Sequence, residues 1–307
     1  MDFEVEILLA IYNGENYVEE LLDSLKKQTF KNWRIVVSDD GSTDATLSLL
    51  EEYGKKNGIE MQILPFEGIR LGPCKNFERL LIHSTAPYVL FCDHDDVWLP
   101  GKIAMQLDEM KQLEKNSAGG PGLVYSDLIP VNFDLSSRHD SFIEHSRYNW
   151  YQSNNFYYIC HRNPAPGCSM MLNRSAVKAV LPIGKKAIMH DWWCMLVVSS
   201  RGSVSFIKEP LLLYRFHTES FYGLKKVDER TGRGVLVHRI MTLLSPGWYV
   251  RAVTNEFPKI AQVNNLKETH AITFSMMYYV WVLFFGRVVS PLLAKAFPEF
   301  NKLKIKV

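Results

Sequence analysis

The sequence predicts an α/β protein whose mostly parallel central sheet is flanked by helices. Through the first 116 residues, short apolar runs alternate with amphipathic helical patterns, which is typical of strand–helix–strand units. The chain has 307 residues, of which 47% are hydrophobic, so it can bury a substantial core. A disordered or fibrous protein is therefore excluded.

The first strand and helix set the pattern. Residues 4–10 form an apolar run that ends before the turn residues Asn13 and Gly14, and apolar side chains from Val18 to Leu25 then recur at helical spacing. The same unit is repeated with strands predicted at 34–40, 61–65 and 88–93 and helices predicted at 43–56, 75–84 and 101–115.

The pattern changes after residue 117. The polar and aromatic segment 139–158 has no clear periodicity, and we expect it to form loops. Further elements are expected as an extended stretch at 122–133, a strand at 167–174, a buried helix at 190–202 and two extended runs within 204–217.

Charge is distributed unevenly along the chain. The formal net charge is +2, which argues against a general nucleic-acid-binding protein. Residues 225–307 nevertheless carry 13 Lys and Arg against 5 Asp and Glu. This basic part contains an apolar run at 271–286 that is short for a membrane span, even when extended to 293. An interfacial helix on an anionic membrane, a buried helix and a true span all remain open.

The cysteines and the N-terminus favour a cytoplasmic protein. The five cysteines form no C-x-x-C pair and most lie in apolar runs, so we expect them to be reduced and buried. The first residues lack the basic segment of a secretory signal. If the basic region binds lipid, the protein would lie at the cytoplasmic face of the inner membrane.

An acidic tetrad follows the predicted strand at 88–93. Its carboxylates, Asp93, Asp95 and Asp96, are hard oxygen ligands suited to Mg²⁺ or Mn²⁺. In an extended backbone Asp93 and Asp95 would point to the same side. A solvated turn that caps the next helix is the alternative interpretation.

A second acidic group, Asp39 and Asp40, lies at the end of the strand predicted at 34–40. Asp, Ser and Thr are common helix-capping residues, so capping alone could explain the segment 39–44. Two carboxylates at one strand end exceed what a cap requires, and one of them could accept a hydrogen bond from the imide N–H of uracil or thymine.

Three segments occur in a characteristic order: IYNGENYVEELLDSLKKQTF (11–30), DDGSTD (39–44) and CDHDDVWLPGK (92–102). In this order they resemble family 2 glycosyltransferases with the GT-A fold, over about residues 4–220. The stretch 71–103 is most similar to the bacterial rhamnosyltransferase branch of that family.

The resemblance implies a domain organisation. Residues 1–220 would form a GT-A domain that binds a nucleotide-sugar donor, with a donor-binding half at about 1–116 and an acceptor half at about 117–220. Residues 221–307 would form a basic helical extension that contacts the membrane.

The resemblance also implies roles for individual residues at the donor site. Ala10 and Tyr12 match positions that line the nucleotide-base pocket, and Asp40 matches the aspartate that recognises the base. Lys75 and Asn76 lie where the family often contacts the donor, although Lys75 could equally be a solvated residue at a helix start.

Further roles are implied for the metal and the catalytic base. Asp95 matches the metal ligand of the D-x-D motif, and Asp93 matches a ribose or metal contact. Asp191 occupies the place of the catalytic base, with an N-cap as the alternative. Arg215 and His217 resemble a late Y-R-x-H element, in which the arginine holds diphosphate or bridges strands and the histidine approaches the metal.

These implications converge on an inverting, metal-dependent glycosyltransferase that transfers one sugar from a dTDP- or UDP-sugar to a glycan or lipid-linked acceptor of the bacterial surface. Rhamnose from dTDP-rhamnose is suggested by the branch, with hexose and N-acetylhexosamine donors open. The Q-x-x-R-W motif of processive synthases is absent, which favours single addition.

Two other function classes are the alternatives to a glycosyltransferase. A nucleotidyltransferase would need a glycine-rich, basic loop after the first strand, which the sequence lacks, as it lacks P-loop and dinucleotide fingerprints. A non-catalytic sugar-nucleotide-binding scaffold is disfavoured because Asp40, Asp93, Asp95 and Asp191 are intact.

Overall fold

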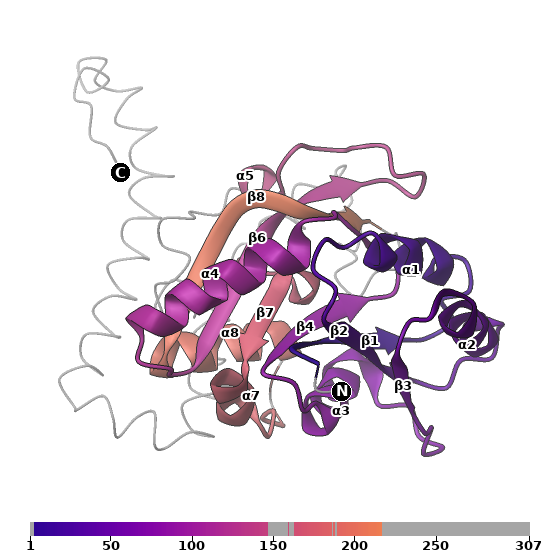
Figure 1. Ribbon diagram of the computed structural model, residues 1–307, viewed down its shortest axis with the longest axis horizontal. Helices are drawn as coiled ribbons and strands as arrows, with labels where there is room; N and C mark the ends of the chain where they lie inside the picture. Colours follow the sequence, from indigo (N-terminus) through magenta and orange to yellow (C-terminus); the bar gives the residue numbers. More distant parts are fainter. Residues whose placement is uncertain (1–2, 147–158, 160–162, 186, 188, 217–307) are drawn as a thin grey trace, which may run out of the picture. The chain divides into compact units, whose positions relative to one another are not determined.

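The computed structural model describes residues 3–146, 159, 163–185, 187, 189 and 190–216 (Figure 1). The predicted extension at 221–307, with its apolar run, lies outside the described residues. Within the described residues, no helix combines the length and the apolar character needed to cross a bilayer.

The described strands form one sheet of eight strands in the order β3-β2-β1-β4-β7-β6-β8-β5. Their bounds are β1 Val5–Ile11, β2 Trp33–Asp39, β3 Met61–Leu64, β4 Tyr88–Asp93, β5 Val97–Trp98, β6 Gly122–Val131, β7 Met170–Asn173 and β8 Ser203–Arg215. Strands β3, β2, β1 and β4 are parallel, as are β6 and β8, whereas β7 runs antiparallel to both of its neighbours. The predicted α/β fold with a mostly parallel sheet is confirmed.

Helices cover both faces of the sheet (Figure 1). They are α1 Val18–Lys26, α2 Thr46–Asn57, α3 Gly72–His83, α4 Lys102–Asn116, α5 Phe142–His145, α7 Arg174–Val180 and α8 His190–Arg201. Apolar residues of α1 and α4 pack with Ile7 and Leu9 of β1 in the main core. On the other face Phe77 of α3 packs edge-on against Phe91 of β4, because successive strand residues point to opposite faces.

The second half of the described chain differs from its sequence-based prediction in two places. The strand expected at 167–174 is a 3₁₀ turn at Gly167–Ser169 followed by the four-residue β7. β7 stops because the Asn173 side chain accepts a hydrogen bond from Ala176 N–H and caps α7. The two extended runs expected within 204–217 are one strand, β8, whose pairing with β6 is shifted near Asp127.

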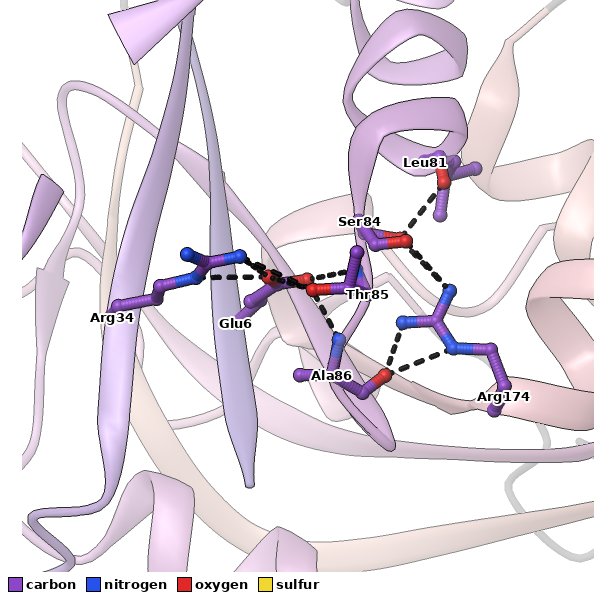
Figure 2. Close-up of polar contacts among 7 residues, drawn as sticks. All are labelled: Glu6, Arg34, Leu81, Ser84, Thr85, Ala86 and Arg174. Carbon is purple, nitrogen blue, oxygen red and sulfur yellow. Dashed lines mark hydrogen bonds and ion pairs between the residues drawn. The ribbon is translucent and has the colours of Figure 1, made fainter. Parts of the chain in front are cut away.

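The amino ends of the parallel strands carry a buried charge network (Figure 2). The Glu6 carboxylate receives hydrogen bonds from the Arg34 guanidinium and from the N–H groups of Thr85 and Ala86. Arg174 donates to the carbonyl of Ala86 from the other side of the same loop. The loop between α3 and β4 is therefore held by ions on both sides.

Candidate active site

The carboxyl ends of three neighbouring parallel strands bring predicted site residues to one edge of the sheet. In the pairing of β1 with β2, Ile11 lies opposite Asp39, and in the pairing of β1 with β4, Ala10 lies opposite Asp93. Asp40 follows β2 directly, and its N–H donates to the Ile11 carbonyl at 2.9 Å. Because ligands of open α/β sheets bind at this edge, the arrangement defines the candidate site.

Asp39 and Asp40 hold two different backbone segments. The Asp39 carboxylate accepts two hydrogen bonds of 2.9 Å from N–H groups of the turn at 41–42, which is a turn-stabilising role of the kind that the sequence left open. Asp40 is 6% exposed, and its two oxygens accept from Leu71 N–H at 2.6 Å and Gly72 N–H at 2.9 Å. The carboxylate expected to recognise the base thus also fixes the start of α3.

A loop at residues 65–71, which was not predicted, borders the expected base pocket. The guanidinium of Arg70 lies 3.7 Å from the ring centroid of Tyr12. The ring of Phe66 lies so close to Gly41 that a Cβ there would come within 2.8 Å of it. Gly41 also has φ +87°, which a side chain would disfavour. A glycine at this position therefore allows the loop to approach the end of β2.

Lys75 and Asn76 lie at the start of α3 and both have partners in the protein. Lys75 Nζ contacts Glu78 Oε2 at 2.5 Å and donates to the Ile183 carbonyl at 3.2 Å. Asn76 Nδ2 donates to the Ser38 carbonyl at 2.9 Å, and Asn76 Oδ1 is a buried acceptor without a hydrogen-bond partner among the described residues. Asn76 therefore holds α3 against β2 and keeps one acceptor unused.

The chain turns directly after Asp93. β4 ends at Asp93, residues 94–95 form a turn, and β5 begins at Val97. The expectation of an extended backbone through Asp95 is wrong, because this turn reverses the chain before β5 pairs with β8. Strand alternation therefore does not determine how the Asp95 side chain points.

Asp93 is nevertheless surrounded by other carboxyl groups. Burial and the charges of Asp95 and Asp191 together raise the pKa of Asp93 to about 7, against a hydrogen bond from the thiol of Cys168, which lowers it. The charge of Asp191 acts on Asp93 although the two residues lie far apart in the sequence. The D-x-D motif and the predicted base therefore meet in one site.

Asp93, Asp96 and Cys168 offer three ligand atoms that all lie within 4.8 Å of one another. Burial and the charges of Asp95 and Asp93 raise the pKa of Asp96, which is 1% exposed. Asp96 Oδ2 has no hydrogen-bond partner within the described part of the chain. A divalent cation fits this group, because it would neutralise carboxylates that have no ion-pair partner among those residues.

Asp96 was counted among the possible oxygen ligands but not among the metal ligands that the resemblance implies, and Cys168 was not predicted at all. Asp96 belongs to the acidic tetrad, so its spacing after the strand was a usable signal. No signal in the sequence pointed to Cys168, because only the pairing of β7 with β4 brings it to Asp93.

A buried cation, Lys102, also lies near this group and was not predicted. Its side chain is fully buried, with Nζ 2.6 Å from Gln106 Oε1 and 4.7 Å from the ring centroid of Trp98. Burial lowers the pKa of Lys102 to about 8, and the charges of Cys168, Cys92 and Asp96 oppose that shift.

Arg215 holds the turn that carries Asp95. Its Nε donates to the Asp95 carbonyl at 2.8 Å, and its other guanidinium nitrogens contact the Phe133 carbonyl and the Glu20 carboxylate. Arg215 is 4% exposed and lies over the ring of Tyr17. These contacts correspond to the bridging interpretation of Arg215. His217 lies outside the described residues.

Asp191 is the second residue of α8 and is 2% exposed. Burial raises its pKa to about 6, against hydrogen bonds from Trp192 N–H, Gly167 N–H and the Asn163 side chain, which lower it. The N-cap position of α8 is Met189, and no side chain caps this helix. The alternative interpretation of Asp191 as an N-cap is therefore not observed.

His190 packs beside Asp191 as a neutral ring. The ring is stacked on Phe77 with centroids 4.0 Å apart, and burial lowers the pKa of His190 to about 3. A Cβ on Gly167 would come within 2.6 Å of His190 Nε2. A glycine at 167 therefore lets the backbone approach α8 closely enough to donate to Asp191.

Comparison with known proteins shows which family this chain is similar to. A family model described as Glycosyl transferase family 2 matches residues 6–181. A dTDP-rhamnosyl transferase of Shigella flexneri, RfbG, is 27% identical over 230 residues, which cover 70% of this chain and 73% of that protein.

Two solved structures share the fold. The crystal structure of Staphylococcus aureus TarS 1-349 in complex with UDP matches with a TM-score of 0.51 and 20% identity, over 72% of this chain and 62% of that one. The mannosyltransferase PcManGT of Pyrobaculum calidifontis, in complex with GDP-Man and Mn²⁺, matches with a TM-score of 0.52 and 14% identity, over 91% of this chain and 81% of that one. The chain therefore spans less than two thirds of the TarS fragment but most of the mannosyltransferase.

Proposed function

Because this chain belongs to glycosyltransferase family 2 and is a glycosyltransferase, we propose that it transfers a single L-rhamnose from dTDP-rhamnose to a glycan or lipid-linked acceptor in the synthesis of a bacterial surface polysaccharide. The reaction inverts the anomeric configuration and depends on Mg²⁺ or Mn²⁺. The Shigella relative is a dTDP-rhamnosyl transferase, which supports the choice of donor.

One observation carries the proposal. The charge of Asp191, at the start of α8, acts on Asp93, at the end of β4. An inverting transfer needs a base near the acceptor hydroxyl and a separate group that binds the donor diphosphate. The proximity of these two carboxylates supports one site that holds both substrates.

Asp191 is suited to act as the general base. With a pKa of about 6 it is mostly ionised at neutral pH, yet it is basic enough to take a proton from an attacking hydroxyl. The hydrogen bonds from Gly167, Trp192 and Asn163 hold the carboxylate in place. Attack on the face of the sugar opposite the diphosphate then inverts the anomeric carbon.

The cation would be held by Asp93 and Asp95, with His217 as a further proposed ligand. When bound, it supplies positive charge to the leaving diphosphate. Arg215 contributes by holding the backbone of Asp95 rather than by facing solvent, since it is 4% exposed.

The donor base would lie at Ala10 and Tyr12, with Asp40 accepting the imide N–H. Lys75 and Asn76 lie on the adjacent helix start, where the unused Asn76 Oδ1 is available to a donor hydroxyl. We place the reaction at the cytoplasmic face of the membrane, where the basic region 221–307 would contact anionic lipid.

A thermal-shift panel tests the donor. The protein is heated with Mn²⁺ and dTDP, UDP, GDP, their sugar conjugates or nucleoside triphosphates, because a ligand that binds the native state raises the melting temperature. We expect the largest metal-dependent shift with dTDP and dTDP-rhamnose. A larger shift with UDP- or GDP-sugars would overturn the donor, and a shift confined to triphosphates would overturn the reaction.

A further inference from the structure

The environment of Cys168 differs from that of an ordinary buried thiol. Cys168 is fully buried and lies in the 3₁₀ turn at Gly167–Ser169, next to β7. β7 pairs antiparallel with β4, with Leu90 opposite Met171, and the turn just before β7 brings the Cys168 thiol within 4.8 Å of carboxylate oxygens of Asp93 and Asp96. The sheet itself therefore places a thiol at the D-x-D motif.

The thiol completes a group of three donor atoms that has no ion pair among the described residues, although the charge of the buried Lys102 acts on Cys168 and Asp96. Asp93, Asp96 and Cys168 offer two carboxylate oxygens and one sulfur within 4.8 Å of one another. Asp96 Oδ1 accepts a hydrogen bond from Arg215 N–H at 3.4 Å, whereas Asp96 Oδ2 is buried without a partner among the described residues. Buried carboxylates are costly unless a cation or donors compensate them.

The mixed donor set differs from the one that Mg²⁺ or Mn²⁺ requires. Those ions prefer oxygen ligands alone, whereas a thiolate selects zinc and similar ions. Two oxygens, one sulfur and an open position correspond to a three-ligand zinc site. Ligand atoms around a tetrahedral zinc lie about 3.5 Å apart, so closure from a separation of up to 4.8 Å needs a movement of about 1 Å.

We propose that Asp93, Asp96 and Cys168 bind a thiophilic divalent cation of the zinc class through the Cys168 thiolate. Binding releases the thiol proton to solvent and forms a metal–sulfur bond without any redox change. Because Asp93 is shared with the proposed Mg²⁺ or Mn²⁺ site, zinc competes with the ion that supports transfer. The proposal concerns cation binding and stands whether or not the chain transfers sugar.

Titration of the full-length protein with Co²⁺, after treatment with a chelator, tests the proposal. Co²⁺ replaces zinc in such sites, and a thiolate ligand gives an intense near-ultraviolet charge-transfer band. We expect this band in the wild type, its loss in Cys168→Ser, and Co²⁺ binding at least about tenfold weaker in Asp96→Asn.

Cys92→Ser is the matched control, because Cys92 is also fully buried and lies on β4 but does not belong to the three-atom group. It should keep the band. Circular dichroism of each cation-free variant establishes that it is folded. If Cys168→Ser does not fold, Cys168→Ala takes its place, and the spectrum of the wild type remains decisive.

Two results would overturn the proposal: a folded wild type that shows no charge-transfer band at saturating Co²⁺, or a band that persists in the folded Cys168 variant. Failure of sugar transfer has a separate signature, since Asp191→Asn should lose transfer while retaining the Co²⁺ band. The two proposals can therefore fail independently.

Discussion

The two ends of the same parallel strands carry carboxylates in opposite electrostatic states. At the amino end, burial raises the pKa of Glu6, but hydrogen bonds and the charge of Arg34 outweigh it and the net pKa is lowered. At the carboxyl end, burial and neighbouring carboxylates raise the pKa of Asp93, and no ion pair offsets them among the described residues. One sheet thus contains a compensated and an uncompensated acid.

The comparison indicates that carboxylates stabilise this protein at the amino ends of the strands and destabilise it at the carboxyl ends. Glu6 is stabilised as an anion by partners that the fold itself provides (Figure 2). Asp93, Asp96 and Asp191 have no ion-pair partner among the described residues, and under the proposed function a cation or a substrate proton would compensate them. Such sites commonly cost folding stability in return for activity.

The largest expected effect comes from removing the proposed base. Asp191→Asn should lower the transfer rate about 10³-fold, equivalent to about 4 kcal/mol, because the acceptor proton has no base to receive it. Donor affinity should be kept, and the melting temperature should not fall, because the substitution removes a buried charge that disfavours the folded state. Steady-state kinetics with dTDP-rhamnose and calorimetric titration of dTDP measure the two quantities.

Asp108→Asn is the control for that substitution, since Asp108 is exposed on α4. It should leave transfer unchanged. Near-normal turnover in Asp191→Asn would remove Asp191 from the mechanism and place the base elsewhere.

Neutralising Glu6 should have the opposite effect to Asp191→Asn: stability should fall while transfer is kept. Glu6→Gln should lower the free energy of unfolding by about 2–3 kcal/mol at pH 7, because it leaves Arg34 without its anionic partner. Urea unfolding measures the change, and transfer per folded molecule should stay the same.

The pH dependence of that change provides a check. The folded pKa of Glu6 is lowered, so its contribution is present above the unfolded value of 4.5 and is lost as the pH falls through the folded value. A difference between Glu6→Gln and wild type that persists unchanged in acid would contradict the ionic explanation.

Lowering the pH should reduce the transfer rate and, at the same time, reduce the electrostatic penalty that Asp191 imposes on the folded state. Since Asp191 must be ionised to accept a proton and its pKa is about 6, transfer should fall about tenfold per pH unit below that value. A raised pKa also means that ionised Asp191 disfavours the folded state, a penalty that fades as the pH falls from about 6 towards 3.8. Rate profiles between pH 5 and 8 test this, and a flat profile would exclude Asp191 as the titrating base.

The smallest effect is expected from a conservative change in the compensated network. Arg174 donates through its guanidinium to the Ala86 and Ser84 carbonyls, and a lysine cannot form the same fork. Arg174→Lys should therefore lower stability by about 1 kcal/mol, measured by urea unfolding, with unchanged kinetics. A larger effect on the transfer rate than on stability would mean that the two ends are coupled.

The sequence predicted the fold of residues 1–116 better than the rest, because the signals for those strands lie within short stretches of sequence. Strands β1, β2 and β4 are apolar runs that stop at turn or acidic residues, so their ends and the site edge could be located. β7 has four residues and ends where Asn173 caps a helix, which periodicity over longer windows cannot detect.

The same contrast applies to the site. Asp40 follows β2 directly and Asp93 ends β4, so their shared edge was predictable from the parallel topology. Cys168 and the loop at 65–71 reach the site through antiparallel pairing and through a close approach to Gly41. Neither contact has a signature in spacing, because both depend on long-range packing.

The short strand β7 has a consequence for local unfolding. It pairs with β4 through three residues and with β6 through three, and within the described sheet it joins the parallel group β3-β2-β1-β4 to the group formed by β6, β8 and β5. Because so few hydrogen bonds hold β7, we expect these two groups of strands to unfold as separate cooperative units. Their amide hydrogens should then exchange at different rates.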